Sequence, residues 1–169
     1  MIHIYTGNGK GKTTASVGQV IRGAGAGMKV FFFQFMKDGS SSEISVLEKI
    51  GVTVMCCHEC NKFTFQMNED EISAVKISHN KILDKAINII ESGSADMIVL
   101  DEFFGAYNAN LLDSELAEKI ISGKYNAEII LTGRNAPSVF MNKADYITVM
   151  QKLKHPYDSG AGARKGIEY

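Results

Sequence analysis

A glycine-rich segment with two lysines follows the first few residues of the chain. It reads TGNGKGKTT and spans residues 6–14, and it is called the glycine loop below. Its last part matches the G-K-[ST] end of the phosphate-binding motif, whereas the position of the motif's first glycine holds Thr6. Glycines allow several backbone N–H groups to turn inward around an anion at the start of a helix. We therefore expect nucleotide contacts from Gly7, Asn8, Gly9, Lys10, Gly11, Lys12, Thr13 and Thr14.

Two side chains of this loop have distinct expected roles. Lys12 is placed to reach the phosphates, and the hydroxyl of Thr13 is placed to bind a divalent cation such as Mg²⁺ or Mn²⁺. The alternative is a glycine turn that only joins a strand to a helix. The strand-loop-helix context of the motif favours nucleotide binding.

A pair of acidic residues follows a later apolar segment. MIVLDE ends in Asp101 and Glu102, and a carboxylate at the end of a neighbouring strand suits a hard, oxygen-binding magnesium ion. An ordinary loop would also explain two adjacent acids. Because the glycine loop is present, we predict that one of these acids binds the metal ion, and either Asp101 or Glu102 could supply the carboxylate ligand.

Two arginines are candidate phosphate ligands. Arg134 follows a predicted strand in LTGR, so we expect it on the ligand side of an open α/β sheet, where it could bind phosphate oxygens in bidentate fashion. Arg22 lies in the first predicted helix, where a surface salt bridge is an equally good explanation.

A cluster of soft ligands and a pair of aromatic residues follow each other in CCHECNKFTF. Cys56, Cys57, His58 and Cys60 suggest zinc, but a structural zinc site usually needs a second ligand pair a dozen or more residues away. No second pair follows, so we predict reduced, buried thiols at a strand end. Phe63 and Phe65 either anchor the loop in the core or form a platform for a flat second substrate.

Length and charge limit the class of protein. The chain has 169 residues and a net charge of -1, with 45% hydrophobic and 22% charged residues, which is typical of one globular domain. The near-zero charge argues against nucleic acid as a partner. Because neither a secretory signal nor a membrane span is evident, we expect a cytoplasmic enzyme of one domain, residues 1–169.

Strand and helix patterns alternate along the chain. This alternation predicts an α/β fold with a mostly parallel sheet of about six strands and helices on both faces. Strands are expected at residues 1–6, 29–35, 52–57, 95–102, 127–134 and 145–150, and helices at 12–26, 42–51, 69–92, 111–123 and 136–144. The long helix should bury a stripe of Ile72, Val75, Ile82, Leu83, Ala86, Ile89 and Ile90. Composition alone predicts a frayed terminus for residues 151–169.

Six segments together resemble one known family. YTGNGKGKTT, VFFFQFMKDG, FTF, VLDE, LTGRNAP and KHPYDSGAGARKGIEY occur in this order in the phosphate-loop corrinoid adenosyltransferases, also called cob(I)alamin or cob(I)yrinic acid a,c-diamide adenosyltransferases. The likeness extends over residues 1–169. It makes the C-terminal segment a family signature, contrary to the expectation from composition.

The resemblance implies a RecA-like homodimer that binds MgATP and a reduced corrinoid. Co(I) is implied to attack the 5′ carbon of ATP and release triphosphate, with Lys12 and Arg134 on the phosphates. Phe63 and Phe65 correspond to the aromatic pair implied to displace the lower ligand of cobalt, which makes Co(II) easier to reduce. An electron donor such as a flavodoxin-type protein is implied as a partner.

One departure and two competing functions accompany this interpretation. Some members carry an N-terminal helix over the corrinoid site. Because this sequence starts at its first strand, we expect the site either to be more open or to be covered by another segment, such as KHPYDSG. A nucleoside kinase of the thymidine-kinase type also pairs a phosphate loop with Asp-Glu, but it leaves LTGRNAP and GARKGIEY unexplained. An ATP-gated corrinoid carrier without turnover is the non-enzymatic alternative.

Overall fold

Six parallel strands form one sheet at the centre of the molecule. The computed structural model describes residues 1–60, 62 and 64–168. The strands are β1 (Ile2–Thr6), β2 (Val30–Gln34), β3 (Thr53–Cys56), β4 (Met97–Asp101), β5 (Glu128–Thr132) and β6 (Tyr146–Val149). Their order is β3-β2-β4-β5-β1-β6, with every neighbouring pair parallel. The carboxyl ends of β1, β4 and β5 therefore meet at one edge, where open α/β sheets bind ligands.

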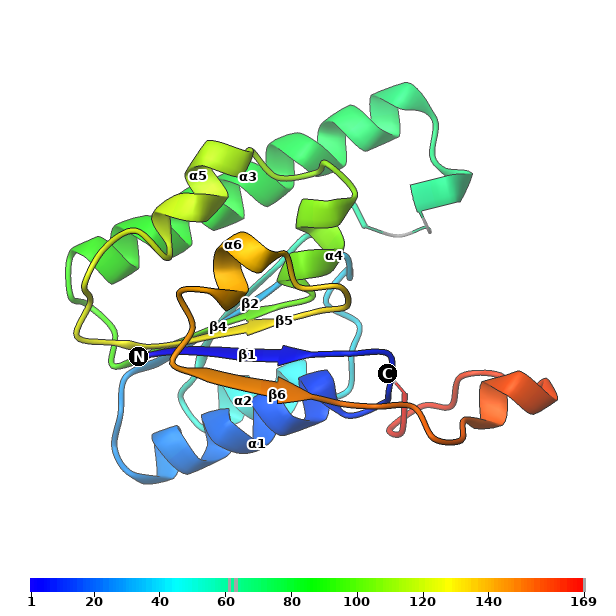
Figure 1. Cartoon of the computed structure of the whole chain (residues 1–169), viewed down its shortest axis with the longest axis horizontal. Helices are drawn as coiled ribbons and strands as arrows, with labels where there is room; N and C mark the ends of the chain where they lie inside the picture. Colours follow the sequence, from blue (N-terminus) through cyan, green and yellow to red (C-terminus); the bar gives the residue numbers. More distant parts are fainter. Residues whose placement is uncertain (61, 63, 169) are drawn as a thin grey trace.

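Helices cover both faces of this sheet (Figure 1). One face carries α1 (Lys12–Gly25) and α2 (Ile44–Lys49), and the other carries α3 (Glu69–Glu91), α4 (Phe103–Asn108), α5 (Ser114–Lys119) and α6 (Ser138–Met141). Two short 3₁₀ turns, η1 (Thr64–Gln66) and η2 (Pro156–Ser159), lie in the connections. The predicted α/β class, the parallel sheet and the two helical layers are confirmed, and the architecture is consistent with a RecA-like fold.

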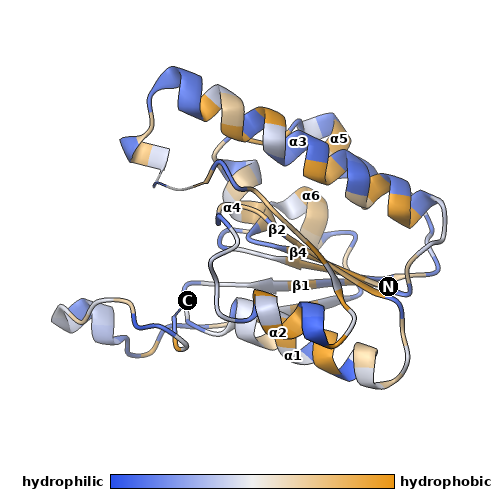
Figure 2. Cartoon of the chain, turned by 180° about the vertical axis from the view of Figure 1, so that it is seen from behind, coloured by the Kyte–Doolittle hydropathy of each residue, from blue (hydrophilic) through white to orange (hydrophobic). Residues whose placement is uncertain are grey.

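The central strands are buried on both faces. Every residue of β2 and β4 is buried, as their continuous apolar sequences predict. Adjacent residues of β2 point to opposite faces, so Phe32 joins the apolar cluster under α1 and α2 while Phe33 joins the larger cluster under α3 to α6. Figure 2 shows the hydrophobic strands between helices of mixed character. Both helical layers are thus held by burial of apolar area.

The longest helix, α3, begins at a capping box. Asn68 accepts a hydrogen bond from the backbone N–H of Glu71, and the Glu71 carboxylate accepts one from the backbone N–H of Asn68. Its buried stripe is confirmed except for Ile72, which is 37% exposed because it lies in the first turn, before the helix reaches the sheet layer. The stripe also includes His79 and Ile87, which were not predicted.

Two helical segments differ from their predictions. The helix expected at residues 111–123 is confined to α5, because Asp113 accepts a hydrogen bond from the backbone N–H of Leu116 and caps the helix there. The helix α4 was not predicted. Its aromatic and glycine content gives weak helix propensity, and tertiary packing stabilises it through edge-to-face contacts among Phe103, Phe104 and Phe140.

The edge strand and the C-terminal segment are the most exposed parts of the fold. Every residue of β6 is exposed, and residues 151–168 extend from it past the carboxyl edge of the sheet (Figure 1). Within the described part of the chain, no helix has both the length and the apolar character that crossing a membrane requires.

Candidate functional site

The glycine loop joins β1 to α1 and packs against the end of β6. Gly7 and Gly11 have positive φ angles of 107° and 114°, a backbone conformation that glycine adopts without steric cost. The backbone N–H of Gly9 donates a hydrogen bond of 2.7 Å to the carbonyl of Met150. A Cβ atom at Gly9 would lie 2.8 Å from the same carbonyl oxygen. The loop is therefore held too close to β6 for any larger residue.

We expect Gly9→Ala to destabilise the protein, because the added methyl group meets backbone atoms that cannot rotate away. Overpacking of this kind costs about 1–3 kcal/mol. The matched control is Gly18→Ala in the middle of α1, where an added Cβ meets nothing within 4 Å. That change should raise the free energy of unfolding by about 0.5–1 kcal/mol. Urea unfolding of both variants checks the pair, and equal effects would contradict the packing of the loop on β6.

Lys12 is held inside the loop. Its side chain is buried, and its Nζ donates hydrogen bonds of 2.9 Å each to the carbonyls of Gly7 and Gly9. Burial lowers the pKa of Lys12, and the neighbouring charge of Arg134 lowers it further, while Glu102 and Asp101 raise it. A buried cation at the start of a helix suits a polyanionic ligand.

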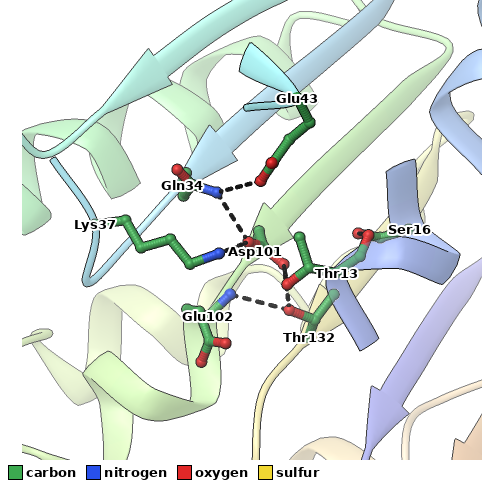
Figure 3. Close-up of polar contacts among 8 residues, drawn as sticks. All are labelled: Thr13, Ser16, Gln34, Lys37, Glu43, Asp101, Glu102 and Thr132. Atoms are coloured by element: carbon green, nitrogen blue, oxygen red, sulfur yellow. Dashed lines mark hydrogen bonds and ion pairs between the residues drawn. The ribbon is translucent and has the colours of Figure 1, made fainter. Parts of the chain in front are cut away.

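A fully buried carboxylate connects the loop to the centre of the sheet (Figure 3). Asp101 ends β4, and its Oδ1 accepts hydrogen bonds from the hydroxyls of Thr13 at 2.9 Å and Thr132 at 2.8 Å. Its Oδ2 accepts one from Gln34 Nε2 at 3.1 Å and lies 3.5 Å from Lys37 Nζ. Four donors therefore share the two oxygens, which satisfies a charge that burial would otherwise penalise.

The neighbouring acid, Glu102, is arranged differently. It has a left-handed backbone conformation with φ of 56°, fixed by a hydrogen bond of 2.9 Å from its N–H to the Thr132 hydroxyl. This turns its carboxylate away from Asp101 (Figure 3) and toward the cavity over the glycine loop. Within the described chain no group donates a hydrogen bond to that carboxylate. Burial raises the pKa of Glu102, and the Asp101 charge raises it further.

This environment gives Glu102→Gln a testable effect on stability. A carboxyl group whose pKa is raised by folding costs stability above its unfolded pKa, because the folded state disfavours the ionised form. We expect Glu102→Gln to raise the melting temperature at pH 8 in the presence of EDTA, and the gain should shrink as the pH falls toward 4.5. Thermal unfolding across this pH range is the measurement. A gain that grows at acid pH would contradict a penalised carboxylate.

Three adjoining cavities lie at the carboxyl edge of the sheet. One, of about 330 Å³, is lined by α1, Lys37 and Glu43, and the other two share Arg134. The smaller of these two, of about 190 Å³, is lined by the glycine loop and by Glu102, and is called the loop cavity. The larger, of about 880 Å³, is lined by Phe65 and by residues of the C-terminal segment, and is called the cleft. Residues that line both are Asn8, Arg134, His155 and Glu168. The shared residues make the two cavities neighbours, so one extended ligand can occupy both.

The aromatic residue Phe65 lines the cleft rather than the core. Its side chain is 81% exposed, in η1 ahead of α3, which contradicts the core-anchoring alternative for this residue. It shares the cleft with Arg134, which lies 69 residues later in the sequence. Phe63, its predicted companion, lies outside the described residues.

The two predicted arginines have different positions. Arg134 follows β5 at the carboxyl edge and lines both cavities. Its backbone carbonyl accepts a hydrogen bond from Asn108 Nδ2, and the preceding Gly133 contacts α4 so closely that a Cβ would lie 2.7 Å from Phe104 Cβ. Arg22 is exposed in the last turn of α1 and lines none of the described cavities. Ten residues of helix, about 15 Å, separate it from Lys12.

Several residues of the site were not predicted. They are Gln34, Lys37, Thr132 and Glu168. A polar Gln34 inside the apolar VFFFQF run was the one available signal, because a buried amide requires a partner. The others reach the site only through the fold. The segment KHPYDSG lines the cleft through His155, Pro156, Tyr157 and Asp158, as expected of a segment that helps to cover it.

The three cysteines are free thiols. Cys57 and Cys60 are buried, as predicted, whereas Cys56 is only half-buried on the other side of the strand. None of them lines the loop cavity or the cleft.

Comparison with known proteins places this arrangement in context. Residues 1–169 match the family model described as ATP:corrinoid adenosyltransferase BtuR/CobO/CobP. The chain is 31% identical to a corrinoid adenosyltransferase of Escherichia coli K12, over 100% of this chain and 85% of the relative. It is 31% identical to one from Sinorhizobium sp, over 100% and 80%, and 30% identical to corrinoid adenosyltransferase CobA of Salmonella typhimurium, over 100% and 85%.

Proposed function

The chain belongs to the ATP:corrinoid adenosyltransferase family, and from this premise we propose that it transfers the 5′-deoxyadenosyl group of ATP to the Co(I) centre of a corrinoid and releases triphosphate. The observation that carries the proposal is the pair of adjoining cavities. A small polar cavity over the glycine loop continues into a cleft large enough for part of a second, flat substrate.

The triphosphate fits the loop cavity. Lys12, the backbone N–H groups of the loop and Arg134 supply positive charge there. We propose that ATP lies with its phosphates in this cavity and its ribose at the boundary with the cleft. Because Asn8 and Arg134 line both cavities, they stand where the 5′ carbon would meet the corrinoid.

The transfer step needs no general base. The electron pair of Co(I) forms the new Co–C5′ bond, the C5′–O bond breaks, and its electron pair leaves with the triphosphate. No proton moves at the reacting carbon, so the protein has to orient the two substrates and stabilise negative charge on the leaving group. Lys12 and Arg134 are suited to this role, and no histidine is required.

A divalent cation, Mg²⁺ or Mn²⁺, fits the oxygen donors beside the loop. Glu102 directs a carboxylate without a hydrogen-bond donor toward the loop cavity, whereas the oxygens of Asp101 are already shared among four donors. We therefore assign direct metal binding to Glu102 and the Thr13 hydroxyl, and assign to Asp101 the orientation of Thr13. The ion would neutralise charge on the triphosphate.

The corrinoid is proposed to enter the cleft beside Phe65. An exposed aromatic ring at the mouth of a cavity suits a flat macrocycle, and an apolar side chain that displaces the lower ligand of cobalt would make Co(II) easier to reduce. Phe63 is proposed as its companion, and a flavodoxin-type protein as the electron donor. We place the reaction in the cytoplasm, where such donors and reduced thiols occur.

We also propose that the protein is a homodimer. The edge strand β6 exposes Tyr146, Ile147 and Val149 by 51%, 43% and 62%. An apolar, uncovered edge strand offers a surface on which a second chain can pack. Sedimentation equilibrium checks the oligomeric state.

The products of the reaction test the proposed function. The protein is incubated with MgATP and cobalamin reduced to Co(I), and the absorption spectrum is followed in the dark and then after illumination. We expect a light-sensitive adenosylcobalamin spectrum, because light breaks the Co–C bond. ADP with a phosphorylated nucleoside would instead support a nucleoside kinase. Corrinoid binding without product would support a carrier, and either result would overturn adenosyl transfer.

A further inference from the structure

Three buried side chains with soft ligand atoms form a cluster of their own. They are Cys57 after β3, Cys60 in the turn that follows, and His79 in the middle of α3, and one ligand atom from each lies within 4.8 Å of the others. The Sγ atom of Cys60 is 2.9 Å from Cys57 Sγ and 3.3 Å from His79 Nε2. The backbone N–H of Cys60 donates to the Cys57 carbonyl and closes the turn that brings the two sulfurs together.

We propose that Cys57, Cys60 and His79 bind one zinc ion. Thiolate and imidazole are the ligands that zinc prefers, and a tetrahedral zinc ion with three protein ligands takes water as its fourth. Zn–S bonds of about 2.3 Å in a tetrahedral site place two sulfurs roughly 3.8 Å apart, so binding requires the two thiols to separate by less than about 1 Å. The missing downstream ligand of the sequence pattern is thus a single histidine, supplied by α3.

The surroundings of the cluster are those of a ligand site. The side chain of His79 is fully buried, and its Nε2, which lies 3.3 Å from Cys60 Sγ, is the ring nitrogen placed to bind an ion. The backbone N–H of Met36 points to His79 Nε2 at 3.2 Å and also interacts with Cys60. When an ion occupies Nε2, this N–H can donate to the Cys60 thiolate, a contact that supports thiolate ligands.

Burial favours a metal over redox exchange for this pair. Cys57 and Cys60 are 0% and 8% exposed, whereas cysteines that exchange disulfides or sense oxidants have to be reached by another thiol or by peroxide. The imidazole of His79, 3.3 Å from Cys60 Sγ, supplies the third ligand atom that a metal site requires.

The ion would fasten β3 to α3. The segment between Cys60 and α3 contains η1, and an ion that joins His79 to the turn after β3 closes this segment into a loop. Closing a loop in the folded state only is a source of stability. The proposal is independent of adenosyl transfer, because it concerns residues that line neither the loop cavity nor the cleft.

Cobalt(II) substitution tests the site. Reduced protein is freed of metal with a chelator and titrated with Co²⁺ in the absence of nucleotide, while near-ultraviolet thiolate-to-cobalt absorption is recorded. Cobalt bound at the glycine loop would have oxygen ligands and would not give this absorption, so the signal reports only on the cysteine site. We expect saturation at one equivalent per chain. Zinc should displace the cobalt and raise the melting temperature of the full chain.

Matched variants identify the ligands. Cys57→Ser and Cys60→Ser should each lower the thiolate absorption by at least half, and His79→Gln should weaken cobalt binding by at least about 100-fold. Cys56→Ser, next in sequence but on the other face of the sheet, should leave binding unchanged. Absence of the absorption in the natural chain, or equal loss in Cys56→Ser and Cys57→Ser, would overturn the proposal.

A measurement on the unmodified chain covers the case in which a variant does not fold. Alkylation with iodoacetamide, resolved by residue with mass spectrometry, is followed with and without one equivalent of zinc. We expect zinc to slow modification of Cys57 and Cys60 by at least tenfold and to leave Cys56 unaffected. Equal rates at Cys57 and Cys60 with and without zinc would contradict a site at these residues.

Discussion

Replacing Lys12 with alanine should lower the rate of adenosyl transfer by about 10²–10³-fold, the usual effect of removing one preorganised group that stabilises developing charge. The ammonium of Lys12 is buried inside the glycine loop, 2.9 Å from two loop carbonyls. If the loop holds the leaving triphosphate, the loss must appear both in assays that start from Co(II) and in assays that start from preformed Co(I). Single-turnover absorption at saturating ATP measures both rates.

A surface lysine provides the control for this variant. Lys85 is exposed on α3 and lines none of the described cavities, so Lys85→Ala should keep the rate of the unmodified chain. Urea unfolding of both variants separates an effect on the site from an effect on the fold. A Lys12→Ala protein that is folded and transfers adenosyl at the normal rate would contradict the placement of the triphosphate.

Replacing Phe65 with alanine should lower the rate in the assay that starts from Co(II) much more than in the assay that starts from preformed Co(I). Burying a phenylalanine side chain against a ligand is worth about 1.5–3 kcal/mol, which corresponds to a factor of roughly 10–100 in rate. Because Phe65 is proposed to act before the electron is transferred, reaction from Co(II) with a weak reductant should fall by this factor. Reaction from preformed Co(I) should fall much less.

Phe65→Leu is the matched variant for this test. Leucine keeps an apolar side chain that excludes water and donor atoms, so it should retain most of the Co(II) reaction that alanine loses. Electron paramagnetic resonance of bound Co(II) reports directly whether the lower ligand is displaced. If Phe65→Ala lost the same factor in the Co(II) and Co(I) assays, this would contradict the proposal that the ring displaces the lower ligand of cobalt.

Local patterns predicted the elements that position the site. The glycine loop, the acidic end of β4 and the arginine after β5 are each contiguous in sequence, and each follows a strand whose apolar composition identifies it. Parallel strands meet at one edge, so Arg134, Glu102 and the loop come together without further information. These predictions succeed because the chemistry and the element that carries it are adjacent in sequence.

Residues that depend on tertiary packing were not predicted. Thr132 is an ordinary strand residue until β5 brings its hydroxyl to 2.8 Å from Asp101, and His79 looks like any polar residue in a long helix until α3 places it against Cys60. Composition also misrepresented the C-terminal segment. It is mostly exposed and polar, yet His155 and Glu168 line both cavities. The segment has neither the helix nor the strand periodicity of hydrophobic residues, so its sequence pattern does not predict that it lines the cavities.

Arg22 is a residue that the sequence offers as a ligand but that the fold places away from the glycine loop. An arginine in the helix after a phosphate loop is a reasonable ligand on composition, but the direction of α1 places it far from the loop. In the last turn its charge favourably opposes the negative end of the helix dipole, which gives it a structural role of its own. Its contact with nucleotide stays a prediction.

The fate of the three phosphates is the most direct test of the account. The protein is incubated with Co(I) cobalamin, Mg²⁺ and ATP labelled at the γ-phosphate, and the labelled products are separated by anion-exchange chromatography. If the glycine loop holds a leaving group, the label appears in intact triphosphate, one molecule for each adenosylcobalamin formed. Label recovered in free phosphate or in a phosphorylated acceptor, with ADP as the partner product, would contradict the account.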